Sequence, residues 1–139
     1  MKFRYQKIPH HGHDSRQPLV SRPYIPVYLH GKDRSTPSPY YALLDSGADQ
    51  IMFPADLAEQ VGIADIATGI PDQAIGIAGQ RTDIYFHKLE LEVTGDSRRL
   101  SVLAGFSSNI FIPILGRTFF SHYQSVIFHE DKEEVELQV

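Results

Sequence analysis

The stretch 81–106 is the feature that most constrains how this chain can fold. It begins with RTDIYFHKLELEV, in which branched and aromatic side chains are frequent and apolar residues largely alternate with polar ones. The turn-forming sequence TGDSRR follows, and LSVLAGF then has the composition of a return strand. Two strand patterns joined by a turn predict a β-hairpin. We therefore expect a fold built around β-sheet rather than around packed helices.

Shorter strand patterns flank this hairpin on both sides. They are YIPVYLH (24–30), YYALL (40–44), QIMF (50–53), the start of TGIPDQAIGIAGQ (68–80), QSVIFH (124–129) and VELQV (135–139). Helical character is confined to PADLAEQVG (54–62), which starts with proline and ends with glycine, and RTFFSHY (117–123). Many short strands separated by turns, without an internal repeat, indicate a mostly β domain with one or two short helices. A β-barrel and a β-sandwich both fit this pattern.

Composition excludes several classes of protein. The 139 residues fit one domain, and the absence of cysteine excludes disulfides and thiolate metal sites. No apolar run approaches the roughly 18 residues of a membrane helix, and the N-terminus has no apolar secretory segment. These features predict a cytoplasmic protein that does not associate with membranes.

Charge is concentrated at the two ends of the chain. The net charge of −4 matches the sum over residues 130–136, where five acidic residues face one lysine, and residues 1–22 are mildly basic. The basic stretch could be an arm for nucleic acid or a protein partner. Because its charges are sparse and lack interleaved aromatic residues, we expect no nucleic-acid binding. We predict instead a poorly ordered N-terminal extension over residues 1–22.

Three N-terminal histidines raise the question of a metal site. His10, His11 and His13 are residues of a type that often binds metals, but their spacing matches no standard zinc pattern. We therefore predict no metal and no cofactor.

The motif ALLDSGADQIMFP (42–54) carries the candidate chemistry. Asp45 directly follows an apolar strand pattern that we expect to be buried. A carboxylate at such a place has to be hydrogen-bonded. Ser46 offers a hydroxyl, and Gly47 offers a flexible backbone with a free amide. These groups could hold Asp45 as a preorganised, reactive carboxylate, although the same residues also fit a plain turn after a buried strand.

One carboxylate is insufficient for peptide hydrolysis by carboxyl groups. The aspartic proteases are the known example in which two aspartates share one proton. One aspartate takes a proton from water while the other donates a proton to the scissile carbonyl. This chain contains a single Asp-Ser-Gly. A symmetric dimer would bring Asp45 of both chains to the two-fold axis and complete the pair.

Three segments together resemble the retroviral-type aspartic proteases, or retropepsins. LLDSGAD is similar to their catalytic strand and turn, AIGIAGQ to their flap, and ILGR to the element that supports the catalytic loop. The resemblance spans about residues 24–128, with the segments in the same order and spacing. It implies a closed β-barrel of the retroviral-type acid protease fold over residues 23–139. It also implies a homodimeric aspartic endopeptidase. The initiating Met and the absence of a flanking polyprotein lead us to expect a free-standing cellular member of the kind found in bacteria.

The resemblance implies roles around the catalytic turn. Asp45 would be the catalytic aspartate. Ser46 would form a hydrogen bond across the dimer axis, and Gly47 would shape the turn. Ala48 and Asp49 would contact the backbone of an extended peptide or protein substrate.

Further roles fall on the flap and on the segment before the second helix. The flap residues that would close over the substrate are Ile75, Gly76, Ile77 and Gly79. Ile112 and Ile114 would line side-chain pockets. Gly116 would support the catalytic loop, and Arg117 would form an ion pair with Asp49. A surface arginine at a helix start and a simple glycine-containing hairpin are the alternatives for Arg117 and the flap.

Two other functions remain open at the level of sequence. The first is a non-catalytic module of the same fold that binds an extended peptide segment, because fold does not fix function. The second is an unrelated β-barrel with an accidental Asp-Ser-Gly. The termini also differ from those of retroviral enzymes, so the dimer interface cannot be transferred by resemblance.

Overall fold

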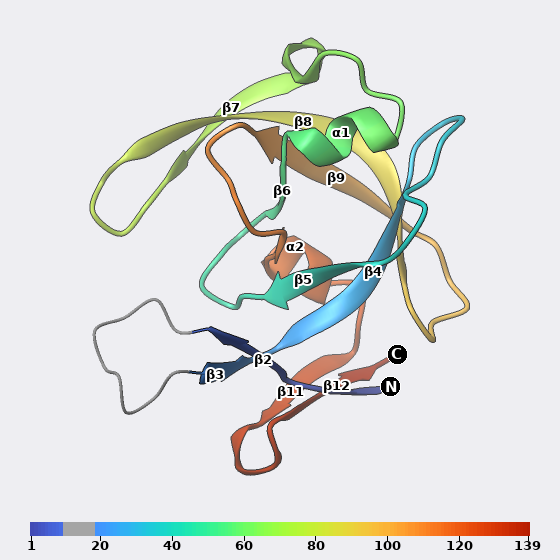
Figure 1. Cartoon of the computed structure of the whole chain (residues 1–139), viewed down its shortest axis with the longest axis vertical. Helices are drawn as coiled ribbons and strands as arrows, with labels where there is room; N and C mark the ends of the chain where they lie inside the picture. The colour runs from blue at the N-terminus through green and yellow to red at the C-terminus, as the bar shows by residue number, and fades with distance from the viewer. Residues whose placement is uncertain (10–18) are drawn as a thin grey trace.

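Strands make up most of the molecule, a computed structural model that describes residues 1–9 and 19–139 (Figure 1). The strands are β1 (Lys2–Arg4), β2 (Gln6–Pro9), β3 (Leu19–Arg22), β4 (Tyr24–His30), β5 (Tyr40–Leu44), β6 (Ile51–Pro54), β7 (Ile70–Ile75), β8 (Arg81–Val93), β9 (Leu100–Ser107), β10 (Ile114–Leu115), β11 (Ser125–His129) and β12 (Glu134–Gln138). The helices are α1 (Asp56–Gln60) and α2 (Arg117–Phe120), with single 3₁₀ turns η1 (Ile66–Thr68) and η2 (Glu130–Lys132). The expectation of a mostly β chain with two short helices is confirmed.

A closed barrel forms the body of the fold. Its strand order is β4-β5-β10-β6-β9-β8, and β8 closes the ring by pairing with β4. β7 extends the sheet beyond β8. The sequence was compatible with both a barrel and a sandwich. The pairing of β4 with β8 shows that the sheet is a barrel, because no free edge remains between these two strands.

The β8–β9 hairpin is the largest element of the barrel, as the sequence predicts. The two strands are antiparallel over Tyr85–Leu91 and Leu100–Phe106. In β8, Leu89, Leu91 and Val93 are buried at alternate positions. Such alternation places one face of a strand on the core. This face packs with Phe53 and the rest of the barrel interior.

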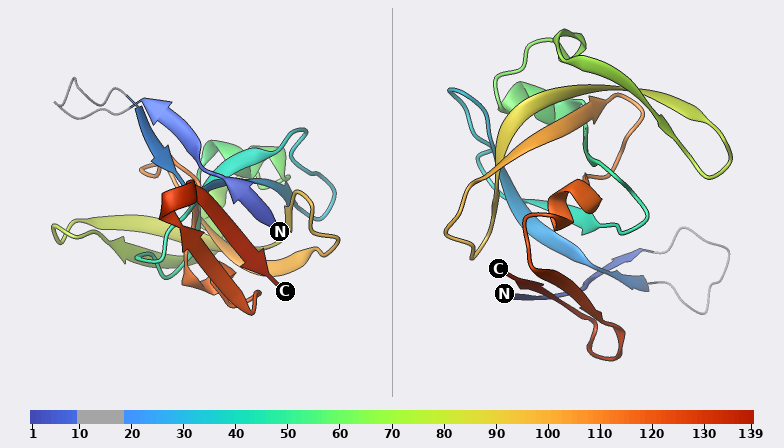
Figure 2. Two further views of the ribbon diagram at one scale, coloured as in Figure 1. Left: turned by 90° about the horizontal axis from the view of Figure 1, so that it is seen from below. Right: turned by 180° about the vertical axis from the view of Figure 1, so that it is seen from behind.

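Residues 1–9 and 19–22 are largely in strands, whereas the sequence predicted a poorly ordered extension. β1 pairs with β12, and β12 pairs with β11, so that both ends of the chain share a three-stranded sheet. The two termini lie side by side in both views of Figure 2, and the Met1 amine donates a hydrogen bond to the Leu137 carbonyl at 2.9 Å. β2 and β3 form a separate two-stranded hairpin. The boundary between residues 22 and 23 stays a prediction, and His10, His11 and His13 lie outside the described residues.

Packing and charge both attach residues 2–5 to the C-terminal hairpin. Phe3 lies opposite Val135 in the β1–β12 pair and packs against the core. Lys2 forms an ion pair with Glu134 at 3.6 Å, and the Tyr5 hydroxyl donates a hydrogen bond to Glu130 at 2.6 Å. The basic start of the chain therefore meets the acidic hairpin at its end. The sequence patterns showed the two charged segments but not that they are neighbours.

None of the helices in the described ranges has the length and apolar character needed to cross a bilayer.

Candidate active site

Asp45 lies at the end of β5, where a short loop (residues 45–50, here called the catalytic loop) leads to β6. Its backbone amide donates to the Leu115 carbonyl at 3.1 Å, which continues the pairing of β5 with β10. The Gly47 amide donates to Oδ1 of Asp45 at 2.9 Å, and the Ala48 amide donates to the Asp45 carbonyl at 3.2 Å. The carboxylate is therefore held by its own turn. It is half-buried and accessible from one side.

The hydroxyl of Ser46 does not take part in this turn. Ser46 is exposed, and its hydroxyl makes no hydrogen bond within the described part of the chain. Its predicted contact would cross a dimer axis, so a single chain leaves that role a prediction.

β10 fixes the catalytic loop from behind. It lies between β5 and β6, parallel to Leu43 and Leu44 and antiparallel to Ile51 and Met52. The chain then enters α2, whose first amides bind the loop. Gly116 donates to the Gln50 carbonyl at 3.1 Å, Arg117 to that of Ala48 at 2.8 Å, and Thr118 to that of Asp49 at 2.9 Å. Every carbonyl from Ala48 to Gln50 is thus paired with this segment.

Gly116 is required here by close approach. A Cβ at this position would lie 2.4 Å from the Gln50 carbonyl oxygen and 2.6 Å from that of Ala48. These are backbone atoms, which cannot rotate away as a side chain can. The structure therefore supplies a steric reason for the glycine in ILGR.

The flap (residues 70–86) is the hairpin of β7 and the first part of β8. Its turn is closed by hydrogen bonds from the Gly76 amide to the Gln80 carbonyl and from the Gly79 amide to the Gly76 carbonyl, both 2.9 Å. Gly79 has φ +80°, a left-handed conformation that favours glycine. Ile77 at the tip is fully exposed. A large apolar residue at the end of a free hairpin is suited to contact a bound molecule.

A cleft of about 580 Å³ lies between the catalytic loop and the flap. It brings together most of the residues that the sequence singled out: Asp45, Gly47, Ala48, Asp49, Ile75, Gly76, Ile77 and Ile114. Gly79 and Ile112 do not line it. Ile112 lies on the exposed β9–β10 connection, and its predicted pocket role stays untested.

The predicted ion pair between Arg117 and Asp49 is absent from the ion pairs of residues 1–9 and 19–139. Both side chains are exposed. The segment uses backbone amides to bind the catalytic loop instead, because α2 begins directly beside the loop carbonyls. This expectation is therefore corrected: Arg117 contributes its main chain, and Asp49 keeps a carboxylate that Arg117 does not neutralise.

Several residues that line the cleft were not predicted from the sequence. Met52, Ile84 and Phe86 form an apolar wall of the cleft, and Asp72 lines it from the flap. Ile84 and Phe86 alternate in β8, which signals one buried face but not what that face contacts. Asp72 carried no signal, because only the β7–β8 register places it opposite Ile84.

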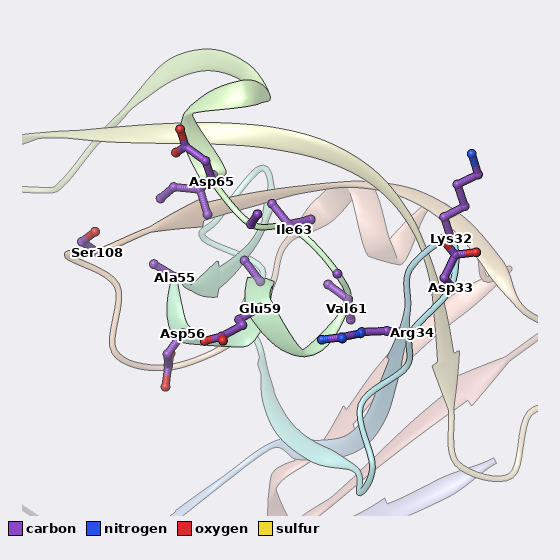
Figure 3. Close-up of a pocket in the computed structure, with 14 residues that line it drawn as sticks. Lys32, Asp33, Arg34, Ala55, Asp56, Glu59, Val61, Ile63, Asp65 and Ser108 are labelled. Carbon is purple, nitrogen blue, oxygen red and sulfur yellow. The ribbon is translucent and has the colours of Figure 1, made fainter.

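A second and larger groove of about 770 Å³ lies beside α1 (Figure 3). Lys32 and Arg34 lie on one side, and Asp56, Glu59 and Asp65 come from α1 and the segment that follows (Figure 3). None of the residues with a sequence-predicted role lines this groove. Within the described ranges, no group of three or more histidine, aspartate and glutamate side chains is placed to hold a metal ion. The cleft at Asp45 is therefore the candidate active site.

Comparisons with known proteins bear on the fold. No protein-family model matches the chain, and no curated protein matches its sequence. A retropepsin-like aspartic protease from Rickettsia conorii superposes with a TM-score of 0.58 at 14% identity, over 81% of this chain and 78% of that one. The retroviral protease-like domain of Ddi1 from Leishmania major gives 0.54 at 15% identity, over 85% and 89%.

A third structure, the EIAV protease complexed with the inhibitor HBY-793, gives a TM-score of 0.48 at 18% identity, over 80% of this chain and 92% of that one. The first two structures confirm the fold that the resemblance implies. At such low identity they show the fold alone, and the roles of individual residues stay predictions.

Proposed function

We propose that this chain, which has the fold of the retropepsin-like aspartic proteases, is an aspartic endopeptidase that acts as a homodimer. One observation carries the proposal. Asp45 is held by the Gly47 amide at 2.9 Å, and it opens into the cleft that the flap covers. A preorganised carboxylate in a cleft bordered by a hairpin is an arrangement suited to carboxyl-catalysed hydrolysis.

The reaction would proceed through water and without a covalent intermediate. Asp45 of one chain would accept a proton from the attacking water, while Asp45 of the other would donate a proton to the carbonyl oxygen. The pair has to keep one shared proton, so we expect activity to decline above neutral pH. An extended peptide would bind beside the flap by strand-like hydrogen bonds. No cofactor takes part in this scheme.

The dimer is needed because each chain supplies a single candidate carboxylate. In Figure 1 the flap tip and the catalytic loop project from the same side of the barrel, and the reverse view in Figure 2 agrees. A second copy facing this side would bring the two Asp45 residues together on a two-fold axis. The proposal includes a cytoplasmic location and no nucleic-acid or membrane partner.

The test is cleavage of a mixed peptide pool, read by mass spectrometry between about pH 4 and 7, a range suited to a coupled carboxyl pair. The wild type and Asp45→Asn would be compared at equal concentration. Asparagine keeps an oxygen that can accept the Gly47 hydrogen bond, so the fold should persist while cleavage is lost. Circular dichroism of both proteins provides the control for folding. Equal cleavage by a pure Asp45→Asn sample would overturn the proposal.

The alternative is a non-catalytic peptide-binding module of the same fold. The observation that favours it is that one chain contains a single Asp-Ser-Gly, which cannot form the pair alone. Sedimentation analysis separates the two functions. A strict monomer at high protein concentration would support the binding module, whereas a dimer would support the enzyme.

A further inference from the structure

The cleft carries acidic side chains without basic ones. Asp45, Asp49 and Asp72 line it, and its described lining includes no lysine, arginine or histidine. Asp49 does not pair with Arg117, as shown above. Asp49 and Asp72 thus add two carboxyl groups to the cleft beside the catalytic one. The cleft therefore presents an anionic surface to whatever binds there.

The strand register directs Asp72 into the cleft. Asp72 lies directly opposite Ile84 in the antiparallel β7–β8 pair. Residues directly opposite one another in such a pair project from the same face of the sheet. Ile84 is 2% exposed and lines the cleft, so Asp72 projects toward the same space.

The other charged side chains of the flap, Arg81 and Asp83, do not line the cleft. Asp83 lies opposite Gln73 and accepts a hydrogen bond from its Nε2 at 3.2 Å. Arg81 donates to Oε1 of the same Gln73 at 3.5 Å. Because side chains alternate along a strand, Arg81 and Asp83 project from the face of β8 opposite to Ile84. Among the ion pairs of the described residues, none joins Arg81 to Asp72.

The carboxylate of Asp72 also keeps the capacity to bind a ligand. Within the described residues its only hydrogen bond comes from the neighbouring Gln73 amide, 2.7 Å from Oδ1. An ionised carboxylate has about four acceptor positions, so most of them are open. The apolar wall of Met52, Ile84 and Phe86 lies nearby in the same cleft.

We infer that Asp72 selects peptides that carry a lysine or arginine next to the apolar residues that occupy the cleft. This inference rests on the proposed function in one respect, namely that an extended peptide binds in this cleft. The cationic group would bind the carboxylate of Asp72 from the flap side. The aliphatic stem of the same side chain would lie along the apolar wall.

The test uses labelled peptides of one apolar sequence with lysine, norleucine or glutamate at a single position, scanned across four positions on each side of the centre. Binding to Asp45→Asn is measured by fluorescence anisotropy, so that the readout does not depend on catalysis. Cleavage by the wild type is measured in parallel. Each assay is repeated with Asp72→Asn and with Asp83→Asn, which removes an equal charge from a position of the same hairpin that does not line the cleft.

We expect lysine at one position to improve binding over norleucine by about twofold to fivefold, the range for an exposed charge pair. Asp72→Asn should abolish this preference, whereas Asp83→Asn should retain it. Equal preference in all proteins, equal loss in both variants, or no preference for lysine would each overturn the inference. If the binding preference follows Asp72 but no Asp45-dependent cleavage occurs, the enzyme proposal fails while this inference stands.

Discussion

Replacement of Gly116 by alanine tests whether the segment before α2 positions the catalytic loop. The backbone of Gly116 is extended, with φ −84° and ψ −165°, so alanine suits its dihedral angles. The added Cβ, however, would lie 2.4 Å from the Gln50 oxygen, 2.6 Å from the Ala48 oxygen and 2.8 Å from the Gln50 nitrogen. The effect should therefore come from steric overlap with the loop alone.

The magnitude follows from the contacts that must yield. To restore ordinary contact distances, the loop has to move away from β10 and α2. This movement strains the hydrogen bonds that Gly116, Arg117 and Thr118 donate to the loop. Overpacking costs about 1–3 kcal/mol, and each weakened hydrogen bond costs up to about 1 kcal/mol. We expect Gly116→Ala to lower the free energy of unfolding by about 3 kcal/mol.

Urea denaturation followed by circular dichroism measures this loss. With a typical slope of about 2 kcal/mol per molar urea, the midpoint should fall by about 1.5 M. Cleavage by the folded variant should fall by about 100-fold, because displacement of a catalytic group by about 1 Å has effects of this size.

Gly79→Ala is the matched control. Nothing lies within 4 Å of its Cβ position, and its φ is +80°. The only cost is therefore the left-handed backbone, about 1 kcal/mol. If Gly116→Ala is as stable as the wild type, or loses no more than Gly79→Ala, the account of loop support by close approach is wrong.

Two further predictions concern the periphery of the barrel. Asp96, whose side chain is 5% exposed, accepts a hydrogen bond from Arg98 at 2.8 Å, and this bond is the main reason that its pKa falls from 3.8 to about 2. A carboxyl whose pKa is lowered by folding stabilises the fold at pH values above its pKa in the unfolded chain. Asp96 should therefore contribute about 2 kcal/mol to the free energy of unfolding above pH 4, and this contribution should be lost as the pH falls through about 2. Urea titrations at pH 6 and pH 2 should show this loss in the wild type but less of it in Asp96→Asn, and an equal acid dependence in both proteins would contradict the assignment. At the N-terminus, Phe3→Ala should lower the free energy of unfolding by about 2 kcal/mol, because Phe3 packs against the core. Lys2→Ala, which removes an exposed ion pair, should lower it by less than about 1 kcal/mol. Equal small losses in the two variants would show that β1 does not contribute to the fold.

Local sequence patterns predicted the elements well. The β8–β9 hairpin, α1 and the turn at Gly47 are all present where the patterns indicated them. In each case the determining contacts join residues that are close in the chain, or follow from one face of a strand being apolar. The hydrogen bond between Gly47 and Asp45 spans two residues, so the motif by itself suffices to suggest it.

The remaining features depend on which distant segments meet. The insertion of β10 between β5 and β6, the contact of Gly116 with the catalytic loop, and the pairing of β1 with β12 all join segments that are far apart in the chain. Arg117 was expected to act through its side chain, and only the placement of α2 shows that its backbone amide binds the loop.

The sequence alone therefore determined the strand-rich character of this protein and the turn that holds Asp45, because both are encoded by neighbouring residues. The tertiary structure decided that the barrel closes, that the basic and acidic ends of the chain pair, and that Asp72 lines the same cleft as Asp45. The physical reason is that a strand buries its backbone groups and its apolar side chains only against neighbouring strands. The partner of each strand is consequently selected by the whole chain rather than by its own residues.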